Sequence, residues 1–117
     1  YKILYRCFMK PLAFRGKSLS DLRAFPESAR RDTGYQLHRV QCGLEPSDWR
    51  PMNTIWPGVQ EIRIRDEAGA FRVIYVAKFR SAVYVLHCFQ KKTQKTSRVD
   101  LDVAAKRYAD LVRELGK

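Results

Sequence analysis

The sequence predicts one α+β domain, with two helices near the N-terminus, a twisted antiparallel sheet and a C-terminal helix. Two patterns carry this prediction: residues 59–89 have the alternation and the β-branched and aromatic runs of strands, whereas residues 100–115 repeat apolar side chains at helical spacing. The chain has 117 residues, which suits a single domain with one core. Residues 1–8 match nothing that follows, and Met9 suits a start. We therefore expect a domain spanning 9–117, preceded by an extension or a remnant of cloning.

The first part of the domain is expected to hold a short strand and two helices in series. Residues 10–14 can form the strand. Ser18 or Ser20 can cap the first helix, because a serine oxygen accepts a hydrogen bond from the free N–H groups at a helix start. Pro26 suits the first turn of the second helix and Gly43 its end, since proline lacks an N–H that this turn leaves unpaired and glycine readily takes a left-handed conformation.

The next segment, residues 45–58, contains three prolines and two tryptophans, a composition that predicts a loop. Large apolar side chains within a loop usually anchor it to the core. We expect Trp49, Met52 and Trp56 to act in this way, and we assign them no binding role.

Three strands are expected after this loop. Residues 59–65 alternate between apolar and charged side chains, as in a strand with two different faces. Residues 66–70 have the composition of a hairpin turn, and 71–79 and 82–89 are nearly continuous apolar runs typical of central strands. The sequence therefore predicts a three-stranded antiparallel meander.

The C-terminal segment has the pattern of an amphipathic helix. Its apolar stripe follows spacings of four, three, four and three residues: Leu101, Ala105, Tyr108, Val112 and Leu115. Asp100 and Asp102 lie near the expected start and Arg113 near the expected end, which suits the dipole of a helix.

The charge of the chain is its most informative overall property. Lysine and arginine number 23 and aspartate and glutamate 12, giving a formal net charge of +11. Such an excess on a small domain favours a polyanionic partner such as RNA, DNA or the ribosome, although a merely basic, well-solvated surface is the plain alternative.

Several classes of function find no support in the sequence. No apolar run approaches the roughly 18 residues of a membrane span, so we expect no membrane partner. The three cysteines, Cys7, Cys42 and Cys88, include no CxxC pair, which argues against a zinc finger or a disulfide framework and favours the reducing cytoplasm. There is no P-loop, no GxGxxG and no acidic pair at metal-ligand spacing, so we expect neither a cofactor nor a metal.

A cluster of basic side chains on the sheet is the candidate site. Arg63 and Arg65 lie on the face opposite Ile62 and Ile64, and Arg72 shares that face if its apolar neighbours point to the core. The loop after the last strand can curl over the same face. It carries three further cations: Lys91, Lys92 and Lys95.

Such a cluster has the chemistry for binding phosphates and for cleaving RNA without a metal. Crowded cations lower the pKa of a lysine, which can then exchange protons near neutral pH, whereas arginines stay charged and stabilise the transition-state phosphate. The plain alternative is a solvated face whose edge lysine only prevents aggregation. His87 lies among apolar residues and is more typical of a packed, hydrogen-bonded histidine than of a catalytic one.

Four segments together resemble a known family. Glu-Ile-Arg at 61–63, Phe-Arg-Val-Ile-Tyr at 71–75, Val-Leu-His-Cys-Phe-Gln-Lys-Lys-Thr at 85–93 and the residues 104–108 resemble the phage-derived HigB-type toxins of the RelE/ParE superfamily. The resemblance implies a RelE-like fold and an endonuclease that enters the ribosomal A site and cuts mRNA there. It also implies neutralisation by a helix-turn-helix, HigA-like antitoxin, through which the pair would bind its operator DNA.

The resemblance also suggests which residues act. Arg63 and Arg72 match basic strand residues near the scissile phosphate, and Lys92, with Lys91 beside it, matches a basic position just after the last strand. Further contacts with RNA are expected from four residues: Arg65, Phe89, Thr93 and Lys95. The C-terminal catalytic tyrosine of RelE-type toxins has no clear equivalent, because Tyr108 lies in the apolar stripe. The general base and acid are therefore open, with the three lysines of the loop as candidates.

Other functions remain open on the same scaffold. A ParE-like gyrase poison would bind a protein and would have less need of a cationic sheet face. A non-catalytic module would bind RNA with a steep dependence on salt and cut nothing. A basic scaffold that binds only its antitoxin is the plainest alternative.

Overall fold

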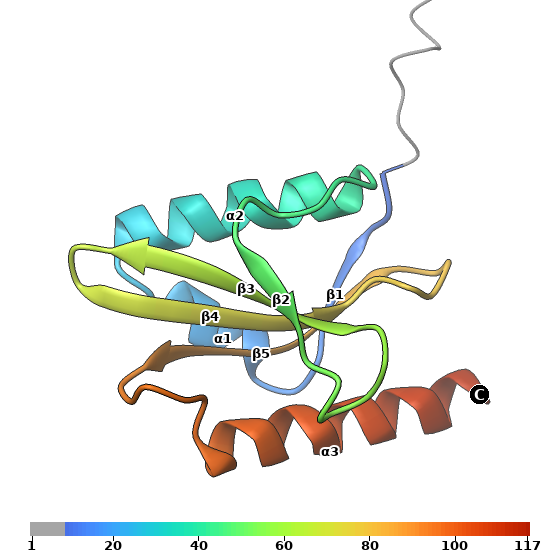
Figure 1. Cartoon of the computed structure of the whole chain (residues 1–117). Coiled ribbons are helices and arrows are strands. Elements are labelled where there is room, and N and C mark those ends of the chain that lie inside the picture. The colour runs from blue at the N-terminus through green and yellow to red at the C-terminus, as the bar shows by residue number, and fades with distance from the viewer. Residues whose placement is uncertain (1–8) are drawn as a thin grey trace, which may run out of the picture.

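A computed structural model describes residues 9–117, and these form three layers around one sheet (Figure 1). Helices α1 (Ser18–Arg23) and α2 (Glu27–Gln41) cover one face, and α3 (Arg98–Leu115) lies across the other. The chain is thus an α+β protein with the two N-terminal helices and the C-terminal helix that the sequence predicts. The extension expected at 1–8 lies outside the described residues.

The sheet has five strands in the order β1, β5, β4, β3, β2. Their bounds are Leu12–Phe14 for β1, Trp49–Pro51 for β2, Val59–Asp66 for β3, Gly69–Val76 for β4 and Val83–Lys91 for β5. The predicted antiparallel meander is confirmed as β3, β4 and β5. The prediction of a purely antiparallel sheet is wrong, because β1 pairs with β5 in parallel. Local patterning says nothing about a partner strand so distant in the sequence.

Strand β2 lies in the segment expected to be a loop. Its three residues pair with β3, and Pro51 is tolerated there because the strand is at the edge of the sheet. Met52 is buried as predicted, at 5% exposure. Trp56 is not an anchor buried in the core: it remains 55% exposed, with its ring stacked on that of Tyr108 at 6.3 Å between centroids.

Apolar residues pack on both faces of the sheet. The face toward α1 and α2 contributes Ile62, Ile64, Phe71, Val73 and Tyr75 to one core cluster. The face toward α3 contributes Val59, Ile74, Val76, Leu86 and Phe89 to another. Strands β3, β4 and β5 are therefore covered on both sides over much of their length.

The helix starts follow the prediction in part. Helix α2 begins after Pro26 and ends at Gln41, with Gly43 in a left-handed conformation (φ +84°) as expected. The predicted serine cap of α1 is wrong. Ser18 is the first residue of α1 and is fully buried. Its hydroxyl donates to the Val85 carbonyl at 3.1 Å, so Ser18 connects α1 to β5 and does not cap the helix.

Helix α3 is capped by Ser97, whose hydroxyl oxygen accepts from the Asp100 N–H at 3.1 Å. Four residues of the predicted stripe pack on the core as expected: Leu101, Tyr108, Val112 and Leu115. Ala105 is exposed instead, because Ala104 and Leu111 complete the buried side of the helix. Within 9–117 no helix combines the length and the apolar composition that a membrane crossing needs.

Candidate functional site

The strand register brings three predicted cations to the face of the sheet that α3 covers. Arg63 on β3 is directly opposite Arg72 on β4, and Arg72 is opposite Phe89 on β5. Lys91 is opposite Ala70, one row nearer the β3–β4 hairpin. Directly opposite residues of antiparallel strands point to the same side. The prediction that Arg63 and Arg72 share a face is therefore confirmed.

A buried carboxylate lies at the centre of these cations. Glu61 has no exposed surface, and its Oε1 is 3.2 Å from the Nε of Arg50 and 3.7 Å from the Nε of Arg72. Its Oε2 accepts a hydrogen bond from the Thr96 hydroxyl at 3.0 Å. Glu61 therefore fixes two guanidinium groups and the loop before α3 in one arrangement. We call Arg50, Arg63, Arg72 and Lys91 the cationic cluster.

Sequence reasoning missed two of these residues. Arg50 was hidden in a segment predicted to be a loop, although β2 pairs it directly with Glu61. Glu61 enters the sequence prediction only as a charged residue of the alternation at 59–65, although it lies on the same side of β3 as Val59, which is completely buried. The signal that could have identified Glu61 was a charged residue on the same face of a strand as an apolar valine two positions earlier.

One guanidinium donor in the cluster is unused. The Nε of Arg63 is buried and donates no hydrogen bond to any part of the chain from residue 9 onward, whereas the buried Nε of Arg72 makes no hydrogen bond but lies at ion-pair distance from Glu61, 3.7 Å. Arg72 itself is only 5% exposed, and its Nη1 donates a hydrogen bond to the Phe71 carbonyl at 3.0 Å. Buried polar groups are nearly always paired, so an unused arginine donor on the strand beside Arg72 is suited to an anion such as a phosphate.

Burial, and after it the neighbouring positive charges, lowers the pKa of two members of the cluster, Lys91 and Arg72. The pKa of Lys91 is lower than the usual value, chiefly because burial costs its ammonium hydration and next because the Arg72 charge repels it; Arg50 and Arg63 add to this. Burial likewise lowers the pKa of Arg72, against an opposing effect of Glu61. Lys91 therefore loses its proton more readily than an ordinary lysine.

The loop after β5 places the other predicted residues at the rim. Lys92, Thr93 and Lys95 are exposed, and Lys95 shares a cavity of about 450 Å³ with Arg50. No hydrogen bond or ion pair within the described chain joins Lys92 to the cluster. Arg65 is also exposed, on the same face as Arg63. Lys92, Lys95 and Arg65 are placed to reach a ligand that the cluster holds, whereas the Thr93 hydroxyl already donates to the Lys95 carbonyl.

Phe89 is not available as an open stacking platform. It is 8% exposed, and its ring stacks on His87 at 4.8 Å between centroids. His87 is buried too, and its Nε2 lies 2.7 Å from Asp100 Oδ1. The pairing of Ile74 with His87 and of Tyr75 with Val85 leaves one extra residue in β5, a bulge that turns His87 toward α3. His87 thus ties β5 to the start of α3, as the packed role predicted for it implies.

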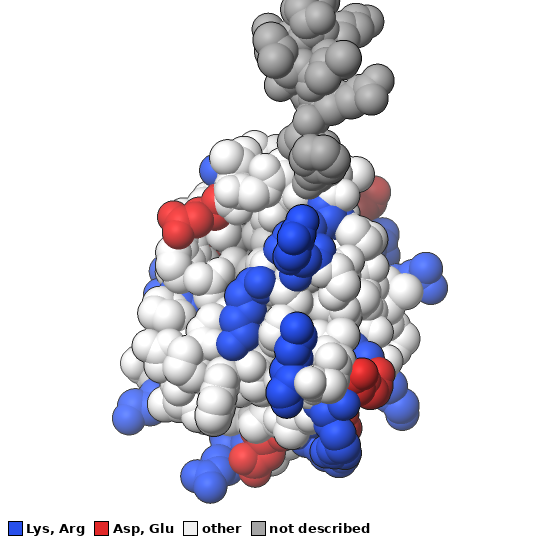
Figure 2. All heavy atoms as spheres, turned by 90° about the vertical axis from the view of Figure 1, so that its right-hand side faces the viewer, with Lys and Arg blue, Asp and Glu red and all other residues white. Residues whose placement is uncertain are grey.

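Lysine and arginine also gather at the opposite end of the molecule. Figure 2 looks at the end that carries the β4–β5 loop and the C-terminus of α3, and basic side chains outnumber acidic ones on it. Among residues 9–117, no three histidine, cysteine or acidic side chains are grouped so as to hold a metal.

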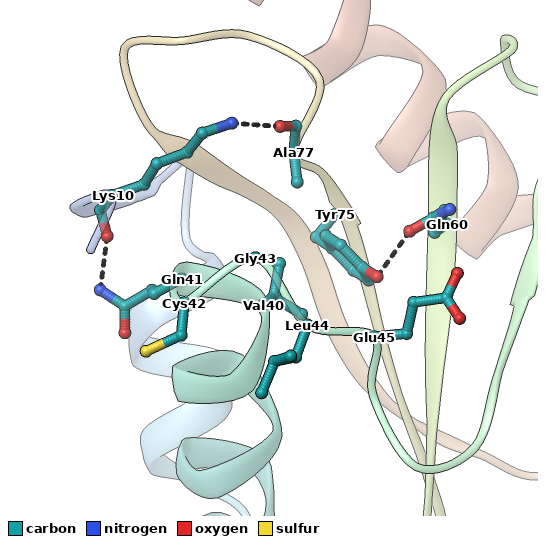
Figure 3. Close-up of a pocket in the computed structure, with 10 residues that line it drawn as sticks. All are labelled: Lys10, Val40, Gln41, Cys42, Gly43, Leu44, Glu45, Gln60, Tyr75 and Ala77. Carbon is teal, nitrogen blue, oxygen red and sulfur yellow. Dashed lines mark hydrogen bonds between the residues drawn. The ribbon is translucent and has the colours of Figure 1, made fainter. Parts of the chain in front are cut away.

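Another cavity, of about 450 Å³, lies between the end of α2 and strands β3 and β4 (Figure 3). Three of its polar side chains are already used: Tyr75 donates to Gln60 Oε1 at 2.6 Å, Gln41 Nε2 donates to the Lys10 carbonyl at 2.7 Å, and Lys10 donates to the Ala77 carbonyl. The unused guanidinium donor of Arg63 is in the cationic cluster, which is therefore the stronger candidate.

Comparison with known families identifies a family for this chain. The family model described as phage-derived protein Gp49-like (DUF891) matches residues 20–109, a stretch that contains the whole cationic cluster. The chain belongs to this family. Gp49-like proteins form a toxin-type family of the RelE/HigB-like kind. No curated protein matches the chain.

Proposed function

We propose that this Gp49-like protein is the toxin of a type II toxin–antitoxin system and that it cuts mRNA in the ribosomal A site without a metal ion. One observation carries the proposal: Arg63, Arg72 and Lys91 from three strands meet on one face, with the buried Nε donor of Arg63 unused. The toxin-type family supports the same assignment. The net charge of +11 suits entry into a site built of RNA.

The proposed reaction needs a base, an acid and stabilisation of a phosphate. The RNA 2′-oxygen attacks phosphorus, so that a 2′-O–P bond forms, the P–O5′ bond breaks, and a cyclic phosphate and a 5′-hydroxyl result. Arg63 and Arg72 bind the non-bridging oxygens, where negative charge grows in the transition state. Two arginines suit this task because they remain protonated and offer several donors in fixed directions.

Proton transfer is assigned to the lysines. Neutral Lys91 takes the 2′-hydroxyl proton, since its lowered pKa leaves more of it unprotonated near neutral pH than an ordinary lysine. The leaving 5′-oxygen takes a proton from the ammonium group of Lys92 or Lys95, both exposed at the rim. Glu61 touches no substrate in this scheme and positions Arg50 and Arg72.

Partners follow from the same proposal. The substrate is mRNA on the ribosome, and a helix-turn-helix antitoxin would neutralise the toxin and carry it to operator DNA. Such an antitoxin must mask or compete with a strongly cationic surface, so acidic segments are expected in it.

A reconstituted translation reaction with primer extension on the mRNA tests the activity. We expect translation to stop and cuts to appear at positions set by the reading frame, and only on ribosome-bound mRNA. Arg72→Ala should abolish the cuts. Arg31→Ala removes the same charge from the exposed outer side of α2, where its side chain is 73% exposed, and should leave them.

Three results would overturn the proposal. Uninterrupted translation without cuts contradicts the endonuclease. Inhibition of DNA supercoiling with intact mRNA would assign the protein to the gyrase poisons. Salt-sensitive binding of RNA without cleavage, even on ribosomes, would make it a binding module.

A further inference from the structure

A groove lies at the end of the sheet farthest from Lys91. Its volume is about 720 Å³, and its walls are the loop between β2 and β3, the loop between β4 and β5, and the C-terminal half of α3. This end of the molecule is on the right in Figure 1 and faces the viewer in Figure 2. The groove shares none of its lining residues with the cationic cluster.

The floor and walls of the groove are mostly apolar. Ala105, Ala109 and Val112 line it from α3, and Ile55 and Trp56 line it from the loop opposite. Trp56 is the decisive side chain, because it remains 55% exposed although one part of its ring stacks on a helix residue. Exposed tryptophans beside an apolar hollow are the side chains that most often dominate protein–protein binding.

The charged residues that line this groove are all basic. Lys78, Arg113 and Lys117 line it, and no aspartate or glutamate does, while Arg113 pairs at 3.1 Å with Asp110, which lies outside the lining. Lys78 is held in place: its Nζ donates to the Pro57 carbonyl at 2.9 Å and lies 5.5 Å from the centre of the Tyr108 ring. The occupant must therefore supply apolar side chains for the floor and negative charge for the rim.

We propose that this groove binds a short amphipathic helix of an acidic partner protein. Apolar residues on one face of such a helix fill the floor beside Trp56, and its acidic residues meet Lys78 and Lys117. A second copy of this chain is disfavoured, because two chains of charge +11 repel each other. RNA fits the rim but not the aliphatic floor of Ile55 and Val112, which offers no partner for a base edge or a phosphate.

Calorimetric titration with designed peptides tests the proposal. The probe is a helical peptide of about 18 residues, long enough to fold in part alone, with leucines along one face and glutamates elsewhere. We expect it to bind and to shift the indole signal of Trp56 in NMR spectra. A peptide with lysine in place of every glutamate should bind at least tenfold more weakly.

Matched variants locate the binding. Ala109→Glu puts a carboxylate into the groove at an exposed helix position, where it can pair with Arg113 one turn later, so the fold is retained. It should weaken the acidic peptide at least tenfold. Ala24→Glu adds the same charge at the exposed end of α1, on the other side of the sheet, and should change affinity less than twofold.

The inference stands apart from the proposed catalysis, because Arg72→Ala should bind the peptide like the unaltered protein even if it cuts nothing. Equal binding of the acidic and lysine peptides, or full binding by Ala109→Glu, overturns it. The proposal is also overturned if an oligouridine shifts the Trp56 signal and the acidic peptide does not. Sedimentation tests for self-association. If the unaltered protein is a dimer and Ala109→Glu makes it monomeric, the groove binds a second copy and the proposal is overturned as well.

Discussion

The two faces of the central sheet are built from the same strands yet serve different ends. Toward α1 and α2, neighbouring positions of β3 and β4 are apolar and almost wholly buried, as Ile62, Ile64 and Val73 illustrate. On the face toward α3, the first residue of β3 is the apolar Val59, and the next residue on that face is the charged Glu61. The face toward α1 and α2 therefore contributes to stability along its whole length. The other face contributes to stability only where α3 packs on it.

The energies of the two faces differ accordingly. A fully buried aliphatic side chain contributes about 1.5–3 kcal/mol to the free energy of unfolding. A buried ion pair contributes about nothing, because the loss of hydration offsets the attraction of the charges. Glu61 with Arg72 and the unused Arg63 donor therefore costs stability that apolar residues would supply. A costly cluster of this kind is typical of a functional site.

The largest expected effect breaks the charged face alone. Arg72→Ala removes the guanidinium that is paired with Glu61 and opposite Arg63, and cleavage should fall by about two to three orders of magnitude, the usual loss for a group that stabilises transition-state charge. Single-turnover cleavage on ribosomes measures the loss, and circular dichroism should show a folded protein. Cleavage within threefold of the unaltered rate would exclude Arg72 from the site.

The next effect breaks the apolar face alone. Ile64→Ala should lower the free energy of unfolding by about 3 kcal/mol, because Ile64 is 1% exposed and its loss leaves a cavity under α2. Urea titration measures this change. Cleavage per folded molecule should remain as it was, since Ile64 points away from its neighbour Arg63. A loss of cleavage as large as that of Arg72→Ala would contradict the division between the faces.

Glu61→Gln should affect both properties and so sharpens the comparison. The amide oxygen can still accept from the Thr96 hydroxyl, but the charge that faces Arg50 and Arg72 is lost. We expect a destabilisation of about 2 kcal/mol and a fall in cleavage of about tenfold, because cations without their buried partner repel each other and lose their fixed positions.

Glu67→Gln is the matched control for that variant. Glu67 is exposed in the β3–β4 turn, so the same chemical change there should alter stability by less than about 0.5 kcal/mol. A Glu61→Gln protein as stable and as active as the control would mean that the carboxylate neither holds nor positions the guanidinium groups.

Much of this division could be predicted from the sequence, because strand alternation is a local property. The alternation through 59–65 placed Arg63 opposite the apolar face, and the next strand added Arg72. The rest depends on contacts between distant segments. Arg50 joins the cluster because β2 pairs with β3, and the buried Glu61 contacts Thr96 from the loop before α3. No local pattern reports such contacts.

The N-terminal strand and the C-terminal helix show the same limit. The strand at 10–14 was predicted, but its parallel partner β5 was not, since parallel pairing leaves no turn signal. The periodicity of α3 was predicted correctly, whereas the rotation that exposes Ala105 depends on how the helix settles on the sheet.

The smallest expected effect concerns Lys91 and depends on pH. Its pKa is lowered in the folded protein, first by burial and then by Arg72, so folding penalises the protonated form. The penalty is fully present at pH 7 and disappears as the pH rises toward 10.5, the usual lysine value. Lys91→Met should therefore raise the free energy of unfolding at pH 7 by at most about 0.5 kcal/mol, because solvent screens this partly exposed ammonium.

Urea titrations at pH 7 and pH 10 check this effect, and the gain should shrink at the higher pH. Lys17→Met is the matched control, since Lys17 is exposed just before α1 and no ion pair of the described residues involves it; it should change neither value. If Lys91 is also the base, the rise of the cleavage rate with pH should disappear in Lys91→Met and persist in Lys17→Met. A gain in stability without any change in the pH profile would leave Lys91 on the charged face but remove it from proton transfer, and Lys95 would then be the lysine to test.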